Sequence, residues 1–173
     1  MKKIDKYVAL QQKCQAILDD LRVPRSSALE EIHQWVQEHR GRPLVLRELP
    51  EQAALTGACG LWLGTDDADY VFYEPRAAPL HQEHIILHEI GHILTDHHRA
   101  GAAAPEEVTG QLLDGLQPHL VKRLMARTSY TTVEEQEAEM IASLLKSVRK
   151  AERLDDRLRR LGAFLGVLVN ESE

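Results

Sequence analysis

The stretch HIILHEIGHILTD at residues 84–96 constrains this chain more than any other, because it contains the motif H-E-x-x-H. Residues four positions apart lie on one face of an α-helix, about one turn apart. On a helix, His88 and His92 therefore direct their imidazoles at one point, and two nitrogens at that spacing suit a zinc ion. Glu89 follows the first histidine, and its carboxylate can take a proton from a water molecule held by the ion. The motif thus predicts a metal centre with a general base beside it.

The side chains around the motif predict a buried helix. They are nearly all apolar, namely Ile85, Ile86, Leu87, Ile90, Ile93 and Leu94. Polar histidine and glutamate side chains are costly in such a helix without a partner, and a metal ion supplies one. Gly91 is a poor helix former, by about 1 kcal/mol against alanine, so it predicts close approach by another backbone or by a substrate. We expect the helix to run from about Leu80 to His97.

Composition narrows the class of protein. The chain has 173 residues, enough for one domain with a core, and its net charge of −6 argues against a dedicated nucleic-acid-binding protein. It contains no run of eighteen apolar residues and no secretory signal at its start, so we expect no membrane span. Its two cysteines, Cys14 and Cys59, form no metal-binding cluster. We expect both thiols to be free and the protein to be cytoplasmic.

Hydrophobic periodicity predicts an α+β fold, mainly helical, in a single domain over residues 1–173. We expect N-terminal helices within 1–41, a small sheet within 42–75, the metal-binding helix within 80–98 and C-terminal helices within 131–170. The sheet is predicted to have three strands, mostly antiparallel, and to pack on the motif helix. The strands are expected at 43–48, 60–63 and 70–73, with the last two forming a hairpin.

Several ends and turns can also be assigned. Gly41 is the expected stop of a helix at about 27–39, for which Ser26 or Ser27 is the expected cap. Thr131 or Thr132 is predicted to cap a helix at about 133–149, and a separate amphipathic helix is expected at about 151–169. The acidic turn of Asp66, Asp67 and Asp69 is interpreted as solvated, because it lacks the glycine and distal glutamate of a calcium loop. His33 and His39 are interpreted as surface or edge histidines.

A catalytic zinc ion usually has three protein ligands, and the sequence offers two kinds of candidate for the third. His98 stands ten residues after His88, as in the metzincin pattern, but Thr95 replaces the glycine that would turn the chain. On a continuing helix His98 would lie about 80° around the axis from His88 and would miss the ion.

The other candidates lie in the stretch EEQEAEMIA at residues 134–142. On a helix, Glu135, Glu139 and two alanines share one face, and the alanines allow that face to pack closely on the motif helix. We favour Glu135 as the ligand, with Glu137, Glu139 and His98 as alternatives. Glu139 could instead orient a ligating histidine through its other ring nitrogen. Glu134 and Glu137 are expected to point to water.

The two stretches together resemble the ImmA/IrrE family of metallopeptidases. The residues that carry the resemblance are H-I-I-L-H-E-I-G-H at 84–92 and E-Q-E-A-E-M-I-A-S-L-L at 135–145, and the similarity covers roughly residues 60–146. The family typically shows H-E-L-G-H followed by E-x-E-A-N-x-F-A-x-x-L-L. Glu139 stands in place of the asparagine, Ile141 in place of the phenylalanine, and Lys146-Ser147 in place of a frequent Met-Pro.

The resemblance implies a gluzincin-like, zincin-type fold with zinc held by His88, His92 and Glu135 and with Glu89 as general base. It also implies peptide hydrolysis, possible action on a separate helix-turn-helix repressor, or a role as a toxin-type partner. Tyr130 and His119 are candidates for stabilising the oxyanion, and strand 70–73 could pair with an extended substrate. The alternative is a protein whose zinc ion is not catalytic and which sequesters a transcription regulator without cleaving it.

Overall fold

The computed structural model describes residues 3–25, 28–49, 59–65, 67–97 and 131–164. The elements in chain order are α1 (Lys3–Asp20), α2 (Leu29–Arg40), β1 (Leu44–Glu48), β2 (Gly60–Gly64), β3 (Asp69–Tyr73), α4 (Pro79–Leu94) and α7 (Thr132–Phe164). The predicted α+β class, mainly helical with a small three-stranded sheet, is confirmed. No helix in the described part of the chain combines the length and apolar character needed to span a bilayer.

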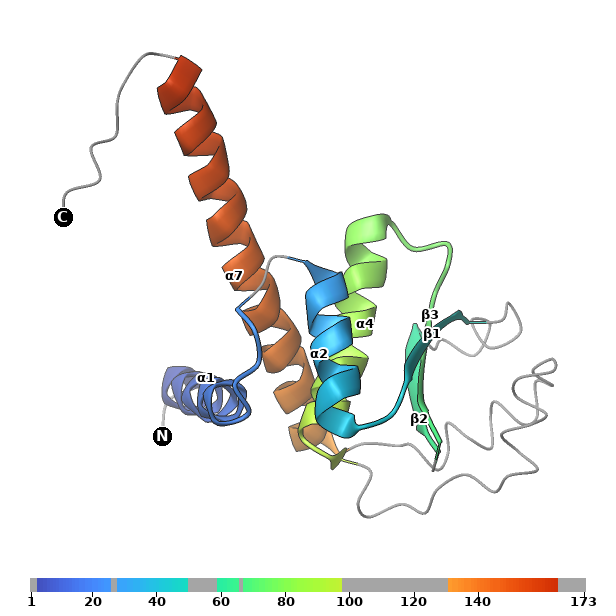
Figure 1. The fold of residues 1–173 in the computed structure, drawn as a ribbon. Coiled ribbons are helices and arrows are strands. Elements are labelled where there is room, and N and C mark those ends of the chain that lie inside the picture. The colour runs from blue at the N-terminus through green and yellow to red at the C-terminus, as the bar shows by residue number, and fades with distance from the viewer. Residues whose placement is uncertain (1–2, 26–27, 50–58, 66, 98–130, 165–173) are drawn as a thin grey trace.

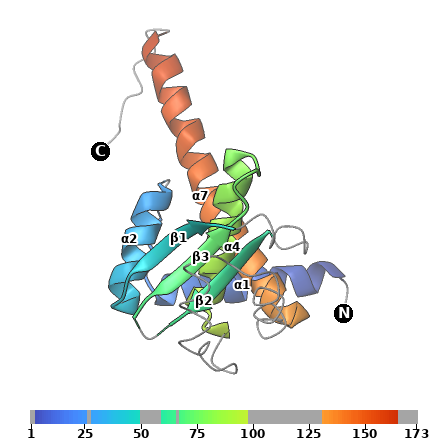
Figure 2. The same ribbon diagram turned by 90° about the vertical axis from the view of Figure 1, so that its right-hand side faces the viewer.

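Helix α4 lies in the middle of the fold. Figure 1 shows α4 between the sheet and the lower half of α7, and Figure 2 shows the helices behind the sheet. The side of α4 that carries Ile86, Leu87 and Ile90 is buried, in the same core as Trp62 and Val71 of the sheet. The predicted apolar surroundings of the motif are therefore the centre of the core.

The sheet has the strand order β1-β3-β2. Strands β2 and β3 pair in antiparallel fashion, with Trp62 opposite Val71, so the expected hairpin is confirmed. Strand β1 pairs with β3 in parallel, with Leu46 opposite Val71, which makes the sheet mixed instead of mostly antiparallel. Because β3 has a neighbour on each side, it cannot be the edge that pairs with a substrate, as we had expected of residues 70–73. Among the described strands, the edge strand that contacts α4 is β2, and we refer to its unpaired side in this part of the chain as the free edge.

Asp69 anchors the hairpin from inside the protein. Its carboxylate is 1% exposed and accepts hydrogen bonds from Arg42 (2.7 and 2.8 Å), from Arg40 (3.2 Å) and from the indole N–H of Trp62 (2.9 Å). The interpretation of this acidic turn as solvated is therefore wrong for Asp69. Arg40 is the last residue of α2 and Arg42 lies just after it, so a segment distant in the sequence supplies the positive charges that stabilise the buried carboxylate.

Helix α7 is continuous from Thr132 to Phe164, so the predicted break near residue 150 is wrong. Lys150, Ala151 and Glu152 are good helix formers, and no glycine or proline interrupts them. The predicted N-cap is confirmed: the Thr131 hydroxyl oxygen accepts from the Glu134 N–H (3.3 Å), and the Glu134 carboxylate accepts from the Thr131 N–H. The second half of α7 extends away from the other elements in both views (Figures 1 and 2).

Helix α4 ends earlier than expected, at Leu94. The Thr95 hydroxyl donates to the Gly91 carbonyl (2.8 Å), and Asp96 takes a left-handed conformation with φ of 51°. Aspartate is among the few residues that tolerate this region, so Asp96 ends the helix as a glycine would. At the end of α2, Gly41 has φ of 65°, as predicted. That helix begins after Ala28, without a side-chain cap, and Ser26 and Ser27 lie outside the described residues.

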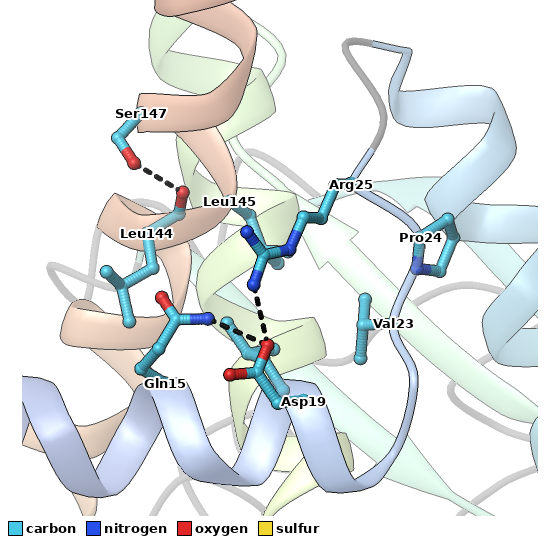
Figure 3. A pocket seen from close by; sticks show the side chains of 9 residues that line it. Gln15, Asp19, Val23, Pro24, Arg25, Leu144, Leu145 and Ser147 are labelled. Atoms are coloured by element: carbon cyan, nitrogen blue, oxygen red, sulfur yellow. Dashed lines mark hydrogen bonds and ion pairs between the residues drawn. The ribbon is translucent and has the colours of Figure 1, made fainter.

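The turn after α1 is fastened near α7. Figure 3 shows Asp19 accepting hydrogen bonds from Arg25 (2.9 Å) and Gln15 (3.1 Å), next to Leu144 and Leu145 of α7. These side chains surround a small cavity of about 50 Å³. Helix α1 packs against α7 on the side of α7 that carries Glu137.

Candidate metal centre

His88, His92 and Glu135 come together between α4 and α7. The Nε2 atoms of the two histidines are 3.2 Å apart, and the Glu135 carboxylate oxygens lie 3.4 Å from His88 Nε2 and 3.7 Å from His92 Nε2. Ligands about 2.0–2.1 Å from a tetrahedral zinc ion are about 3.3 Å apart. The three ligand atoms therefore have the separation that a single metal ion requires, and this residue group could hold one.

Close packing of the two helices creates this cluster. A Cβ atom at Gly91 would lie 2.9 Å from both Cα and the carbonyl oxygen of Ala138, well inside contact distance. Ala138 and Ala142 are fully buried. The predicted roles of Gly91 and of the alanine face are thus confirmed, because only small residues let the two backbones approach this closely. Of the glutamates considered as a third ligand, Glu135 is the one that faces both histidines.

The cluster is buried on one side and open on the other. The His92 side chain is fully buried, whereas the side chains of His88 and Glu135 are 20% and 49% exposed. A metal ion bound here would thus contact a buried histidine on one side and solvent on the other.

Glu89 is buried beside the cluster. Its residue is 6% exposed, and within the part of the chain that the structure describes its Oε2 atom has no hydrogen-bond partner. The pKa of Glu89 is raised to about 8, mainly by burial and also by the charge of Glu135, while a backbone hydrogen bond from Trp62 acts to lower it. Buried polar atoms normally have a partner, so the unpaired oxygen fits a site that receives a metal ion and water.

The start of β2 packs directly against this carboxylate. A Cβ atom at Gly60 would lie 2.7 Å from Glu89 Oε1 and 2.5 Å from the Ile85 side chain. Glycine at this position therefore lets the free edge of the sheet approach the candidate base. The edge strand and Glu89 form one side of the site.

His88 is supported by Glu139. The His88 Nδ1 atom, on the ring side away from the cluster, lies 3.4 Å from Glu139 Oε2, so the predicted orienting role of this glutamate is consistent with the geometry. The same carboxylate lies 3.0 Å from His84 Nε2. Partial burial acts to raise the pKa of Glu139, but hydrogen bonds and charge from His84 and His88 outweigh it and lower that pKa.

His92 is supported by a different set of residues, of which the side chains of His97 and Glu137 are buried. Its Nδ1 atom lies 2.8 Å from Nδ1 of His97, and His97 Nε2 lies 3.3 Å from Glu137 Oε2. The other oxygen of Glu137 contacts the ammonium group of Lys13 from α1. Glu137 is 7% exposed, so the expectation that it points to water is wrong.

Sequence reasoning missed His97 and Lys13 altogether. The predicted helix from Leu80 to His97 is straight, and on a straight helix His97 would not contact His92. The turn at Asp96 brings it back, and an aspartate before a histidine pair was the available signal. Nothing in the sequence pairs Lys13 with a residue 124 positions later.

A groove leads to the cluster between α1 and the beginning of α7. Its volume is about 1120 Å³, and its walls include Lys6, Tyr7, Leu10, Val133 and Met140, with His88 and Glu135 at one end. Tyr7 and Val133 are 60% and 59% exposed. The groove offers an apolar surface that is continuous with the candidate metal ligands.

The remaining candidate residues are placed as follows. His98, His119 and Tyr130 lie outside the described residues. The ring of His33 makes a hydrogen bond with the Leu44 carbonyl (2.7 Å), and His39 stacks on Trp35, so both have structural contacts away from the cluster. Cys14 is buried and Cys59 exposed, and both thiols are free, as expected.

Comparison of the chain with protein-family models, with curated proteins and with solved structures gave no match.

Proposed function

We propose that this chain is a zinc-dependent metallopeptidase that hydrolyses a peptide bond in a protein substrate. The observation that carries the proposal is the convergence of His88, His92 and Glu135 at metal-ligand separations, with the buried carboxylate of Glu89 beside them. Two histidines and one glutamate, with space for a further ligand, are the donor set of catalytic zinc sites. The resemblance of residues 84–92 and 135–145 to the ImmA/IrrE family supports the same reading.

In the proposed hydrolysis, different residues would bind the metal ion, transfer the proton and align the substrate. His88, His92 and Glu135 would hold the ion, which when bound supplies Lewis acidity toward a carbonyl oxygen and lowers the pKa of water. Glu89 would take the proton of the attacking water and pass it to the leaving amine. The free edge of β2, next to Glu89, would align an extended peptide.

We propose a separate regulator protein, such as a helix-turn-helix repressor, as the substrate, and a cytoplasmic setting for the encounter. The resemblance is the basis for the regulator, and the two free cysteines fit a reducing compartment. The rival is a zinc-containing protein that binds the regulator without cleaving it. The presence of Glu89 favours hydrolysis, because a structural metal site has no need of a buried carboxylate that is not a ligand.

Metal analysis and a cleavage assay test the proposal together. The wild-type protein should bind one zinc ion, Glu135→Ala should lose it, and Glu139→Ala should weaken it without abolishing it. A candidate helix-turn-helix repressor, incubated with the protein, should yield fragments detectable by mass spectrometry. Glu89→Gln should retain zinc and lose cleavage by roughly 10²- to 10⁴-fold. An unchanged cleavage rate in Glu89→Gln would exclude the mechanism, and a stable uncleaved complex with the wild type would favour the rival.

A further inference from the structure

We propose that Lys13, Glu137 and His97 form a positioning chain that fixes the tautomer of His92. In this tautomer the proton of the His92 ring is on Nδ1, and the lone pair of Nε2 faces Glu135 and His88. The inference rests on the proposed metal site but not on peptide hydrolysis. It assigns a role to three residues that are neither metal ligands nor the general base.

The direction of the chain is set at Glu137. A carboxylate has acceptor atoms only, so both of its contacts must be donors. Lys13 supplies a donor to Oε1, and the ring of His97 lies 3.3 Å from Oε2. His97 must therefore carry its proton on Nε2.

The tautomer of His92 follows from the tautomer of His97, because in a neutral imidazole one ring nitrogen donates and the other accepts. With its proton on Nε2, His97 presents a bare Nδ1, which lies 2.8 Å from Nδ1 of His92. His92 must then donate from Nδ1, and its Nε2 is left with a lone pair. That atom lies 3.2 Å from His88 Nε2 and 3.7 Å from Glu135 Oε1, on the side of the metal cluster.

The opposite direction is incompatible with metal binding. If His97 donated from Nδ1, the Nδ1 of His92 would have to accept, and the ring proton of His92 would be on Nε2. A protonated Nε2 has no lone pair to give to a metal ion. Second-shell hydrogen bonds fix the orientation and tautomer of metal-binding histidines in this way.

Because its residues next to His92 are buried, the positioning chain should affect metal binding more than Glu139, the residue that supports His88. The side chains of His92, His97 and Glu137 are 0%, 7% and 9% exposed. Glu139, which supports His88, is 55% exposed, so water can replace it. We therefore expect the metal site to depend more on Glu137 than on Glu139.

Zinc affinity of the full-length protein, measured by competition with a chromophoric chelator, is the first test. Glu137→Gln and His97→Phe should each weaken zinc binding by about 10- to 100-fold, and Glu139→Gln by less. Glu48→Gln makes the same charge change at an exposed position of β1 and should leave the affinity unchanged. Thermal unfolding of the metal-free variants reports whether each one is folded. A folded Glu137→Gln and a folded His97→Phe with wild-type affinity would overturn the proposal.

A second variant separates this role from a merely structural one. In Glu137→Gln the glutamine has a single acceptor oxygen, and Lys13 competes for it. The NH₂ group of the glutamine would then face His97, which would reverse the direction of the hydrogen bonds from residue 137 through His97 to His92. Lys13→Met frees that oxygen for His97. The double variant Lys13→Met/Glu137→Gln should therefore bind zinc more tightly than Glu137→Gln alone. Equal or weaker binding by the double variant contradicts the proposal.

The tautomers can also be observed directly in the metal-free protein. Nitrogen-15 chemical shifts of the imidazole rings should show His92 protonated on Nδ1 and His97 protonated on Nε2. Glu137→Gln should move His92 toward the Nε2-protonated form. A wild-type His92 protonated on Nε2 would overturn the inference. If the protein bound no zinc, the proposed function would fail, whereas this measurement would still decide the direction of the chain.

Discussion

Glu89 occupies an unfavourable position for a charged group. Its carboxylate is buried, one of its oxygens has no partner among the described residues, and the negative charge of Glu135 is close by. Each of these conditions favours the neutral form of the acid. Residues under such strain are typical of functional sites, where a bound ion or substrate relieves it.

The metal-free protein should therefore lose stability as the pH rises. The pKa of Glu89 is about 8 in the folded state against 4.5 as its ordinary value. Between these values the folded state keeps a proton that the unfolded state has released, so the free energy of unfolding falls with increasing pH across that window. Each unit of pKa difference corresponds to about 1.4 kcal/mol. Urea unfolding of chelator-treated protein from pH 5 to pH 8.5 measures the effect.

Glu89→Gln provides the matched control for this pH dependence. The variant keeps the shape of the side chain and has no proton to lose, so its stability should fall less between pH 5 and pH 8. At pH 8 the metal-free variant should be more stable than the wild type, and near pH 4.5 the two should be similar. Parallel pH profiles for the two proteins would contradict the raised pKa.

At the scale of single residues, helical spacing was enough to predict four side chains of the candidate site. His88, Glu89 and His92 follow from the motif, and Glu135 follows from its face on the second helix. Glu137 could not be placed in the same way. It lies on another side of α7 from Glu135, and periodicity alone cannot tell solvent from a covering helix. The α1 helix covers it through Lys13 and Cys14, whose thiol donates to the Glu137 carbonyl at 3.8 Å.

At the scale of elements, the α4–α7 contact brings together the candidate metal ligands of the two helices. Gly91→Ala should separate the helices, because the new methyl group would meet the backbone of Ala138. Overpacking of this kind costs about 1–3 kcal/mol, and it should also weaken zinc binding by moving Glu135 away from the histidines. Thermal unfolding and chelator competition measure the two effects. Helix propensity alone would favour alanine by about 1 kcal/mol, so a more stable variant would show that the contact is not tight.

The types of the elements were predictable, and several of their boundaries were not. Strong apolar periodicity identified the helices and the β2–β3 hairpin. The end of α4 depends on a left-handed Asp96, which the sequence does not reveal, whereas the continuity of α7 could have been predicted from the absence of any breaking residue near position 150. The parallel pairing of β1 with β3 could not be deduced. The two strands are not consecutive in the sequence, so no turn motif between them indicates that they pair.

At the scale of the whole molecule, α1 has two functions that its position in the sequence does not suggest. Its Lys13 contacts Glu137, the residue proposed to support His92 through His97, and its exposed side forms one wall of the groove that ends at the candidate metal ligands. The other wall is the beginning of α7. If the chain cleaves peptides, the groove would hold apolar side chains next to the scissile bond, because Tyr7, Leu10 and Met140 line it.

Tyr7→Ser tests this role of the groove without altering the metal site. Tyr7 is 60% exposed and touches none of the proposed ligands, so zinc affinity and kcat should stay at wild-type values. Lost burial of an aromatic ring on the substrate side is worth about 1.5–3 kcal/mol, so KM should rise about tenfold or more. A rise in KM at constant kcat is the signature of binding that is equal in the ground and transition states. Ile4→Ser is the matched control, because Ile4 is 73% exposed on the same helix and lies outside the groove lining. Equal kinetic effects of the two substitutions would show that the substrate does not lie along this groove.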